Sequence, residues 1–106
     1  MTDLAKEHPQ EYPKGTLSLA EDEVDGLVDE VAGWEVRDGK LVRDFKFHDF
    51  NEAFGFLTRV ALLAEAESHH PDISNSWNQV TLEFWTHTAE GLTRNDFIMA
   101  AKINRF

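Results

Sequence analysis

Apolar residues along this chain switch between the helical period and the strand period, and these switches predict seven elements. The first is a short amphipathic helix, indicated by four aliphatic residues at helical spacing: Val24, Leu27, Val28 and Val31. Ser18 and Glu21 have the spacing of a capping box at its start. Gly33 follows these residues and is expected to end the helix.

A pair of strands is predicted next, because apolar and polar residues alternate on both sides of Asp38-Gly39. This dipeptide is typical of a two-residue hairpin turn. Trp34 and Val36 belong to the first strand, and the second strand runs over residues 41–47. We therefore expect an antiparallel pair.

The longest predicted helix begins at Asp49, where Glu52 completes an N-terminal cap pattern. Its expected core stripe is Phe50, Ala53, Phe54, Leu57, Ala61 and Ala64. Further apolar residues widen the arc beyond what one sheet usually covers: Phe56, Val60, Leu62 and Leu63. A second buried surface, such as a subunit contact, is therefore expected. Pro71 ends the helix and leaves His69 and His70 at, or just past, its C-terminus.

A second strand pair is predicted over residues 73–77 and 80–87, with a bend near Asn78-Gln79. Thr93 and Asp96 have the spacing that begins a last helix. Strand pairs that alternate with helices predict the α+β class. We expect a two-layer sandwich in which helices pack on one face of a four-stranded antiparallel sheet.

The remaining residues, 1–17, contain Pro9, Pro13 and Gly15 and show no apolar period. Such a segment is typical of a flexible N-terminal arm, which leaves residues 18–106 as the single domain. No role is predicted for the arm.

Composition and charge narrow the possible functions. Twenty acidic residues against ten basic ones give a net charge of −10, which repels phosphate backbones and argues against direct nucleic-acid binding. The chain has no cysteine, so disulfides, thiolate metal sites and a cysteine nucleophile are excluded. No segment approaches the roughly 20 apolar residues of a membrane span, so we expect a cytoplasmic protein without a membrane partner.

Candidate chemistry is concentrated between Glu65 and Asp96, where three of the five histidines lie: His69, His70 and His87. The unperturbed pKa of histidine lies close to neutral, so clustered imidazoles are natural proton donors and acceptors. The carboxylates of Glu65 and Asp96 could orient or charge the imidazoles. Three tryptophans could offer a stacking surface to a planar ligand: Trp34, Trp77 and Trp85.

Structural roles remain open for the same residues. His69 and His70 could simply interact with the dipole at the helix C-terminus, and His87 could be a surface residue of its strand. Asp96 could serve only as a helix cap, and Glu65 could be a solvated residue. Three histidines can also hold zinc, but an adjacent pair is awkward for chelation and the H-E-x-x-H motif is absent. We therefore expect no metal.

The spacing of these residues resembles that of the pterin-4a-carbinolamine dehydratases. The pattern is filled by Glu65, His69-His70-Pro71, Trp77, His87 and Asp96. The likeness extends over about residues 18 to 105. Similar flanking segments are Gly33-Trp34, Phe45-Lys46-Phe47, Asp49-Phe50-Asn51, Ala53-Phe54-Gly55-Phe56, Thr58-Arg59-Val60-Ala61 and Gly91-Leu92-Thr93.

The resemblance implies a dehydratase that removes water from 4a-hydroxytetrahydropterin, such as the tetrahydrobiopterin form, to give quinonoid dihydropterin. That reaction recycles the cofactor of aromatic amino acid hydroxylases and needs no cofactor of its own. The resemblance also implies a homo-oligomer, either a dimer or a tetramer.

The resemblance further implies roles for individual residues. His69 and His87 would transfer protons and His70 would orient the pterin, with acid and base unassigned. The expected substrate contacts are Ser68, His69, His70, Trp85, Thr86, His87 and Thr88, and the expected supporting residues are Glu65, Asp96 and Trp34. Trp85 departs from the small Ser or Thr of better-known members, so its indole could stack on the pterin or narrow the pocket.

An alternative function comes from animal members of this family, which also act as dimerisation cofactors of a transcription factor. They bind its dimerisation helices through the surface used for tetramerisation. Phe56, Leu62 and Leu63 are the apolar residues that raise this possibility for the present chain.

Overall fold

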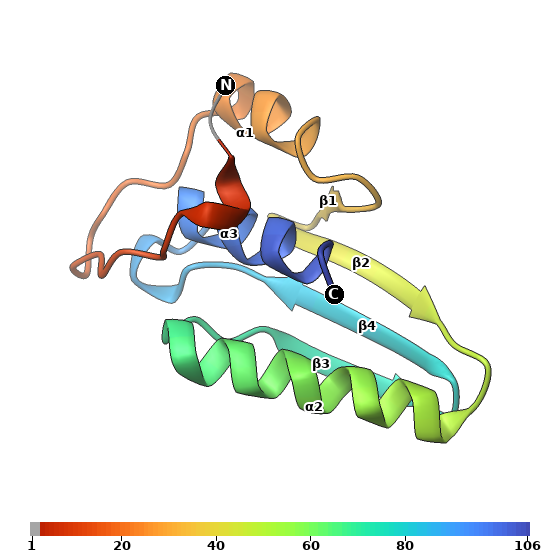
Figure 1. The fold of residues 1–106 in the computed structure, drawn as a ribbon. Coiled ribbons are helices and arrows are strands. Elements are labelled where there is room, and N and C mark those ends of the chain that lie inside the picture. Colours follow the sequence, from red (N-terminus) through yellow and green to blue (C-terminus); the bar gives the residue numbers. More distant parts are fainter. Residues whose placement is uncertain (1–2) are drawn as a thin grey trace.

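The computed structural model describes residues 3–106 and shows one antiparallel sheet with helices packed against it (Figure 1). The elements are η1 (Leu4–Lys6), α1 (Glu21–Val28), β1 (Glu35–Arg37), β2 (Lys40–Lys46), α2 (Phe50–Glu67), β3 (Asp72–Ser76), β4 (Gln79–Phe84), η2 (His87–Ala89) and α3 (Arg94–Ile103). The strand order is β1-β2-β4-β3, and every neighbouring pair is antiparallel. The predicted α+β class and element order are confirmed.

The first hairpin forms where the sequence predicts it. Asp38 and Gly39 both have positive φ, at 51° and 75°, and they join Arg37 to its partner Lys40. Positive φ at both central residues suits the right-handed twist of the flanking strands. Glycine adopts this geometry without strain, which explains the dipeptide.

The helix starts are set by side-chain caps, and one of them differs from the prediction. The Asp49 carboxylate accepts a hydrogen bond from Glu52 N–H at 2.8 Å, as expected for the start of α2. The start of α1 is instead at Ala20, whose N–H donates to Glu23 Oε1 at 3.1 Å. Ser18 therefore lies ahead of the helix, and α1 ends at Val28, well before Gly33.

The face of α2 that packs on the sheet is rotated from the predicted one. Its buried residues are Ala53, Leu57, Val60 and Ala64. Phe50 and Phe54 flank this stripe and are 49% and 56% exposed, so their assignment to the core was wrong. The apolar residues of α2 span an arc that is wider than the face a sheet can cover, so the sheet buries only one side of that arc. Phe56 and Leu63 are partly buried against the core, and Leu62 is 68% exposed.

The core lies between the sheet and the helices. Its largest fully buried side chains come from β2, β4 and α3: Leu41, Leu82, Phe84, Phe97 and Met99. None of the helices described in residues 3–106 combines the length and apolar character that crossing a membrane requires.

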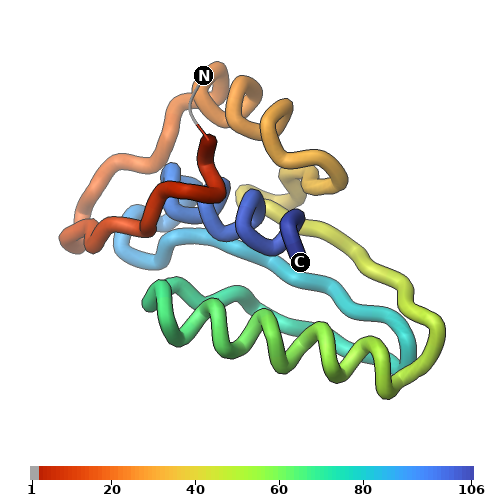
Figure 2. Tube along the Cα trace, viewed as in Figure 1, coloured from red at the N-terminus to blue at the C-terminus, as the bar shows by residue number. Residues whose placement is uncertain are grey.

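The segment before α1 follows α3 and then turns beside the loop between β4 and α3 (Figure 2). Leu4 is buried in the core, and Gly15 N–H donates to Thr88 C=O at 3.0 Å. The residues expected to form a flexible arm thus make specific contacts with the domain. The division of the chain at residue 17 stays a prediction.

Candidate functional site

The end of α2 places the two adjacent histidines. Ser68 caps the helix in the left-handed region, with φ of 55°, and its N–H donates to Ala64 C=O. This conformation turns the chain out of the helix, and Pro71 keeps it extended. His69 and His70 consequently lie past the helix C-terminus, as the sequence predicts.

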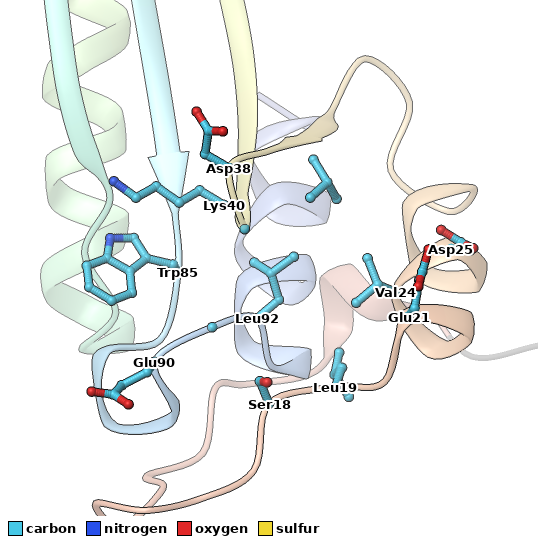
Figure 3. Close-up of a pocket in the computed structure, with 13 residues that line it drawn as sticks. Ser18, Leu19, Glu21, Val24, Asp25, Asp38, Lys40, Trp85, Glu90 and Leu92 are labelled. Atoms are coloured by element: carbon cyan, nitrogen blue, oxygen red, sulfur yellow. The ribbon is translucent and has the colours of Figure 1, made fainter.

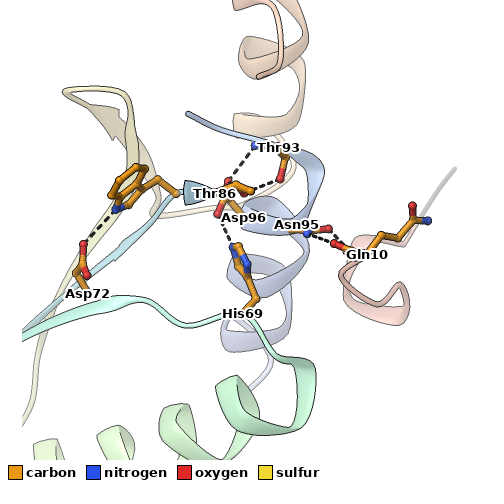
Figure 4. A network of polar contacts seen from close by, with 8 residues as sticks. Gln10, His69, Asp72, Thr86, Thr93, Asn95 and Asp96 are labelled. Carbon is orange, nitrogen blue, oxygen red and sulfur yellow. Dashed lines mark hydrogen bonds and ion pairs between the residues drawn. The ribbon is translucent and has the colours of Figure 1, made fainter. Parts of the chain in front are cut away.

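His69 is held by a buried carboxylate from α3 (Figure 4). Its Nε2 lies 2.6 Å from Asp96 Oδ1, and the Asp96 side chain has no exposed surface. The other oxygen, Oδ2, accepts from Thr93 N–H at 2.9 Å and from Thr86 Oγ1 at 3.0 Å. Asp96 is therefore both the predicted helix cap and the partner of an imidazole: its Oδ2 caps α3, and its Oδ1 contacts His69.

The face of the His69 ring packs on the core. Phe84 stacks on it with ring centroids 5.9 Å apart and an interplanar angle of 8°. Trp34 lies behind Phe84, with centroids 5.8 Å apart, and donates from Nε1 to Asn104 at 2.8 Å. Trp34 is thus a core residue that can support His69 only through Phe84.

His70 is paired with the second predicted carboxylate. Its Nε2 lies 2.5 Å from Glu65 Oε1, and the two side chains are 58% and 79% exposed. Water screens a pair this exposed, so it contributes little to stability. Both supporting carboxylates named from the sequence thus contact one imidazole each.

His87 lies beyond the sheet rather than on a strand, which corrects the prediction. β4 ends at Phe84, and His87 begins the short helix η2 inside a loop closed by pairing of Thr86 with Gly91. Thr86 is buried and donates to Asp96 Oδ2, so the inward-facing side of β4 continues to Thr86 before the chain enters η2.

The indole of Trp85 covers one face of His87. The two rings are stacked, with centroids 3.9 Å apart and an interplanar angle of 18°. Asp72 Oδ2 accepts from the indole Nε1–H at 3.2 Å, and Lys40 Nζ lies 5.4 Å from the ring centroid. These contacts hold the indole against the imidazole, so Trp85 constrains the orientation of His87.

All seven predicted substrate contacts line one cavity of about 370 Å³: Ser68, His69, His70, Trp85, Thr86, His87 and Thr88. Its volume lies within the usual range for small-molecule sites. Three further lining residues, Gln10, Glu11 and Tyr12, come from the N-terminal segment. Sequence reasoning missed them because the segment has no periodicity or motif. Trp77, at 66% exposure in the β3–β4 turn, is not among the lining residues.

A second and larger cavity of about 600 Å³ also has Trp85 in its lining (Figure 3). It is lined by Ser18, Leu19, Glu21, Val24, Asp25, Val36, Asp38, Gly39, Lys40, Trp85, Glu90, Gly91 and Leu92. The lining contains four carboxylates and no histidine, the side chain that most often serves as a general acid or base. The smaller cavity is therefore the candidate active site.

Nothing in residues 3–106 groups three or more potential ligands in a way that could hold a metal ion. The three imidazoles instead have two carboxylates and one indole as their partners. Such an arrangement suits proton transfer to and from a bound organic molecule.

Comparison with known proteins places the chain in a family. The family model for pterin 4 alpha carbinolamine dehydratase matches residues 17–106. The chain belongs to this family. A member of the family from Chlorobium limicola is 53% identical over 88 residues, which are 79% of this chain and 78% of the relative. A member from Rubrobacter xylanophilus is 40% identical over 106 residues, with 99% of each chain covered.

Two further relatives of this pterin dehydratase family carry more specific names. The mitochondrial pterin-4-alpha-carbinolamine dehydratase 2 of Arabidopsis thaliana is 43% identical over 96 residues, covering 86% of this chain and 51% of the plant protein. The crystal structure of a transcriptional coactivator/pterin dehydratase from Brucella melitensis is also similar. It has a TM-score of 0.79 and 40% identity over 83% of this chain and 96% of that one.

Proposed function

We propose that this protein is a dehydratase acting on 4a-hydroxytetrahydropterins, with the tetrahydrobiopterin form as one substrate. The observation that carries the proposal is the single cavity lined by His69, His70 and His87. Family membership supplies the substrate class, because the related proteins are named for the carbinolamine of a pterin.

The reaction needs two proton transfers. A base removes the proton from N5 of the pterin while an acid protonates the hydroxyl on C4a. The C4a–O bond then breaks, the electrons of the N5–H bond form the new double bond, and water leaves. The products are quinonoid dihydropterin and water. Positioned acid–base groups typically contribute about 10²–10⁴-fold to such a step.

His69 suits the role of the base. Asp96, as a carboxylate, accepts from Nε2–H and so leaves Nδ1 as the nitrogen with a free lone pair. A proton taken up at Nδ1 makes an imidazolium whose charge the buried carboxylate stabilises. This is the way a carboxylate orients a histidine base in other enzymes.

His87 is assigned the role of the acid and His70 that of orienting the ring. His87 lines the same cavity and is stacked on Trp85, which fixes the plane of its imidazole. His70 is exposed, paired with Glu65 and part of the cavity lining, so its ring can hydrogen-bond a ligand bound there. No further cofactor takes part in this scheme.

The test is dehydration of freshly generated 4a-hydroxytetrahydropterin, followed by absorbance. We expect the wild type to accelerate it, and His69→Ala or His87→Ala to remove most of the acceleration. His48→Ala is the matched control, because His48 is exposed at the start of α2 and lines no part of the cavity. A wild type no faster than buffer would overturn the proposal.

The outer face of α2 favours an oligomer as the working form. Leu62 is 68% exposed on this face, and Phe50 and Phe54 are 49% and 56% exposed beside the buried stripe; large apolar side chains exposed on one helix are typical of a protein interface. We expect a dimer or tetramer by light scattering, and Leu62→Asp should shift it toward smaller species. A monomeric wild type would contradict this.

The same face would serve the alternative function, a dimerisation cofactor that binds helices of a transcription factor. The relative named a transcriptional coactivator/pterin dehydratase is the observation in favour. Co-purification of a helical partner that is lost in Leu62→Asp, with dehydration unchanged, would support a second role.

A further inference from the structure

The N-terminal strap, defined as residues 3–15, is fastened to the domain along α3. The aliphatic side chain of Leu4 is only 3% exposed. Lys102 Nζ donates to Ala5 C=O at 2.8 Å, and Arg105 pairs with Asp3 at 2.6 Å. The start of the strap is thus held by one apolar anchor and two polar contacts.

The first turn of α3 holds both the strap and the active-site histidine. Arg94 donates two hydrogen bonds to the Glu7 carboxylate, each at 2.7 Å. Asn95 exchanges two bonds with the Gln10 backbone: its Oδ1 accepts from Gln10 N–H at 2.9 Å, and its Nδ2 donates to Gln10 C=O at 2.6 Å (Figure 4). Asp96, the next residue, accepts from His69.

These contacts bring the middle of the strap to the candidate active site. Gln10, Glu11 and Tyr12 line the cavity that also contains the three histidines. Past them, Gly15 N–H donates to Thr88 C=O at 3.0 Å, one residue from His87. Figure 1 and Figure 2 both show this segment turning beside the loop that carries η2.

We propose that the strap forms the outer wall of the active site, where Tyr12 contacts the bound pterin. This rests on the proposed function. Tyr12 is partly buried and brings an aromatic face to a cavity whose ligand would be a planar bicyclic ring. Glu11 adds an exposed carboxylate, an acceptor that suits the N–H groups on the pyrimidine edge of a pterin.

The strap lies ahead of the residues that match the family model, which begin at 17. Any contribution of the strap to pterin binding is therefore separate from that of the three histidines, which lie inside the matched region. Because Arg94 and Asn95 hold it through contacts that do not involve His69, releasing the strap should weaken pterin binding while leaving the proton transfers intact. In kinetic terms, KM should rise and kcat should change little.

The test uses two variants of the full chain and a matched control for each. Tyr12→Ala removes the aromatic face and Tyr12→Phe retains it. Glu7→Gln removes the charged partner of Arg94, and Asp29→Asn removes one charge from an exposed position at the end of α1. Circular dichroism at the assay temperature verifies that each variant is folded.

Three quantities are measured for each variant: kcat and KM for 4a-hydroxytetrahydropterin, and Kd for 7,8-dihydrobiopterin, a stable pterin, by calorimetry. We expect Tyr12→Ala and Glu7→Gln to raise both by about 3–10-fold, with kcat within about twofold of wild type. Tyr12→Phe, which keeps the aromatic face, should raise KM and Kd less than Tyr12→Ala does, and Asp29→Asn should stay within about twofold of wild type for all three values.

Unchanged KM and Kd in folded Tyr12→Ala and Glu7→Gln would overturn the strap proposal and leave the dehydratase intact. A wild type that binds dihydrobiopterin more tightly than Tyr12→Ala, yet does not accelerate dehydration, would overturn the function and retain the strap as a pterin contact. A wild type that neither binds nor dehydrates a pterin would overturn both.

Discussion

Asp96→Asn isolates one hydrogen bond of the candidate active site. In the wild type, Oδ2 accepts from Thr86 and Thr93, and Oδ1 accepts from His69. The asparagine oxygen can take the place of Oδ2 and keep both threonine bonds. Its NH₂ group then replaces Oδ1 and faces His69 Nε2. Only the contact with the imidazole changes, because a hydrogen-bond donor replaces an acceptor there.

The consequence for His69 is a change of tautomer. An NH₂ group donates, so Nε2 must accept and the ring proton moves to Nδ1. Nδ1 can then no longer take the proton from the pterin, and the contribution of a general base is lost. We expect kcat to fall by about 10²–10⁴-fold.

The expected cost in stability is smaller. A hydrogen bond to a charged group contributes about 1.5–3 kcal/mol, part of which is offset because a carboxylate no longer has to be buried. The net loss should be about 1–2 kcal/mol, which lowers Tm by roughly 4–16 °C for a domain of this size. Calorimetry should therefore find a folded protein at assay temperature.

The assay is dehydration of 4a-hydroxytetrahydropterin by Asp96→Asn, His69→Ala and the double variant. Because Asp96 acts through His69, the double variant should be about as slow as His69→Ala alone. A kcat for folded Asp96→Asn within about threefold of wild type would refute the reasoning, since the altered tautomer would then not matter.

Three other outcomes are expected. Hydrogen bonding from Arg94 holds the pKa of Glu7 below its ordinary value of 4.5, so this pair stabilises the fold fully above that pH and the contribution is lost as pH falls through the lower folded-state pKa. The Tm difference between wild type and Glu7→Gln should accordingly be present at neutral pH and vanish in acid; a constant difference would contradict it. Trp85→Ala should lower kcat/KM by about 2–10-fold by freeing His87, whereas Trp85→Phe, which keeps a stacking ring, should lower it less; equal effects would exclude stacking as the cause. Asp49→Ala removes the cap of α2 and should cost about 0.5–2 kcal/mol in urea unfolding, and an unchanged midpoint would show that the cap is dispensable.

Local patterns determined most of the fold. The Asp38-Gly39 turn, the Asp49 cap and the Thr93–Asp96 cap each depend on neighbouring residues, and all three formed as predicted. The same holds for the histidines at the end of α2, because Pro71 acts on the residues just before it.

Which side of α2 would be buried was not decided locally. Phe50 and Val60 both belong to the apolar arc, yet the sheet covers only Val60. Burial follows from how the helix is rotated on the sheet, and that rotation depends on every side chain at the contact.

The site shows the same division. By itself the sequence determined the residue types that can move protons and the spacing that places them near element ends. The tertiary structure alone decided their partners: Asp96 with His69, Trp85 with His87, and Tyr12 at the cavity wall. These contacts join segments far apart in the chain, and a one-dimensional pattern holds no information on the distance between such segments.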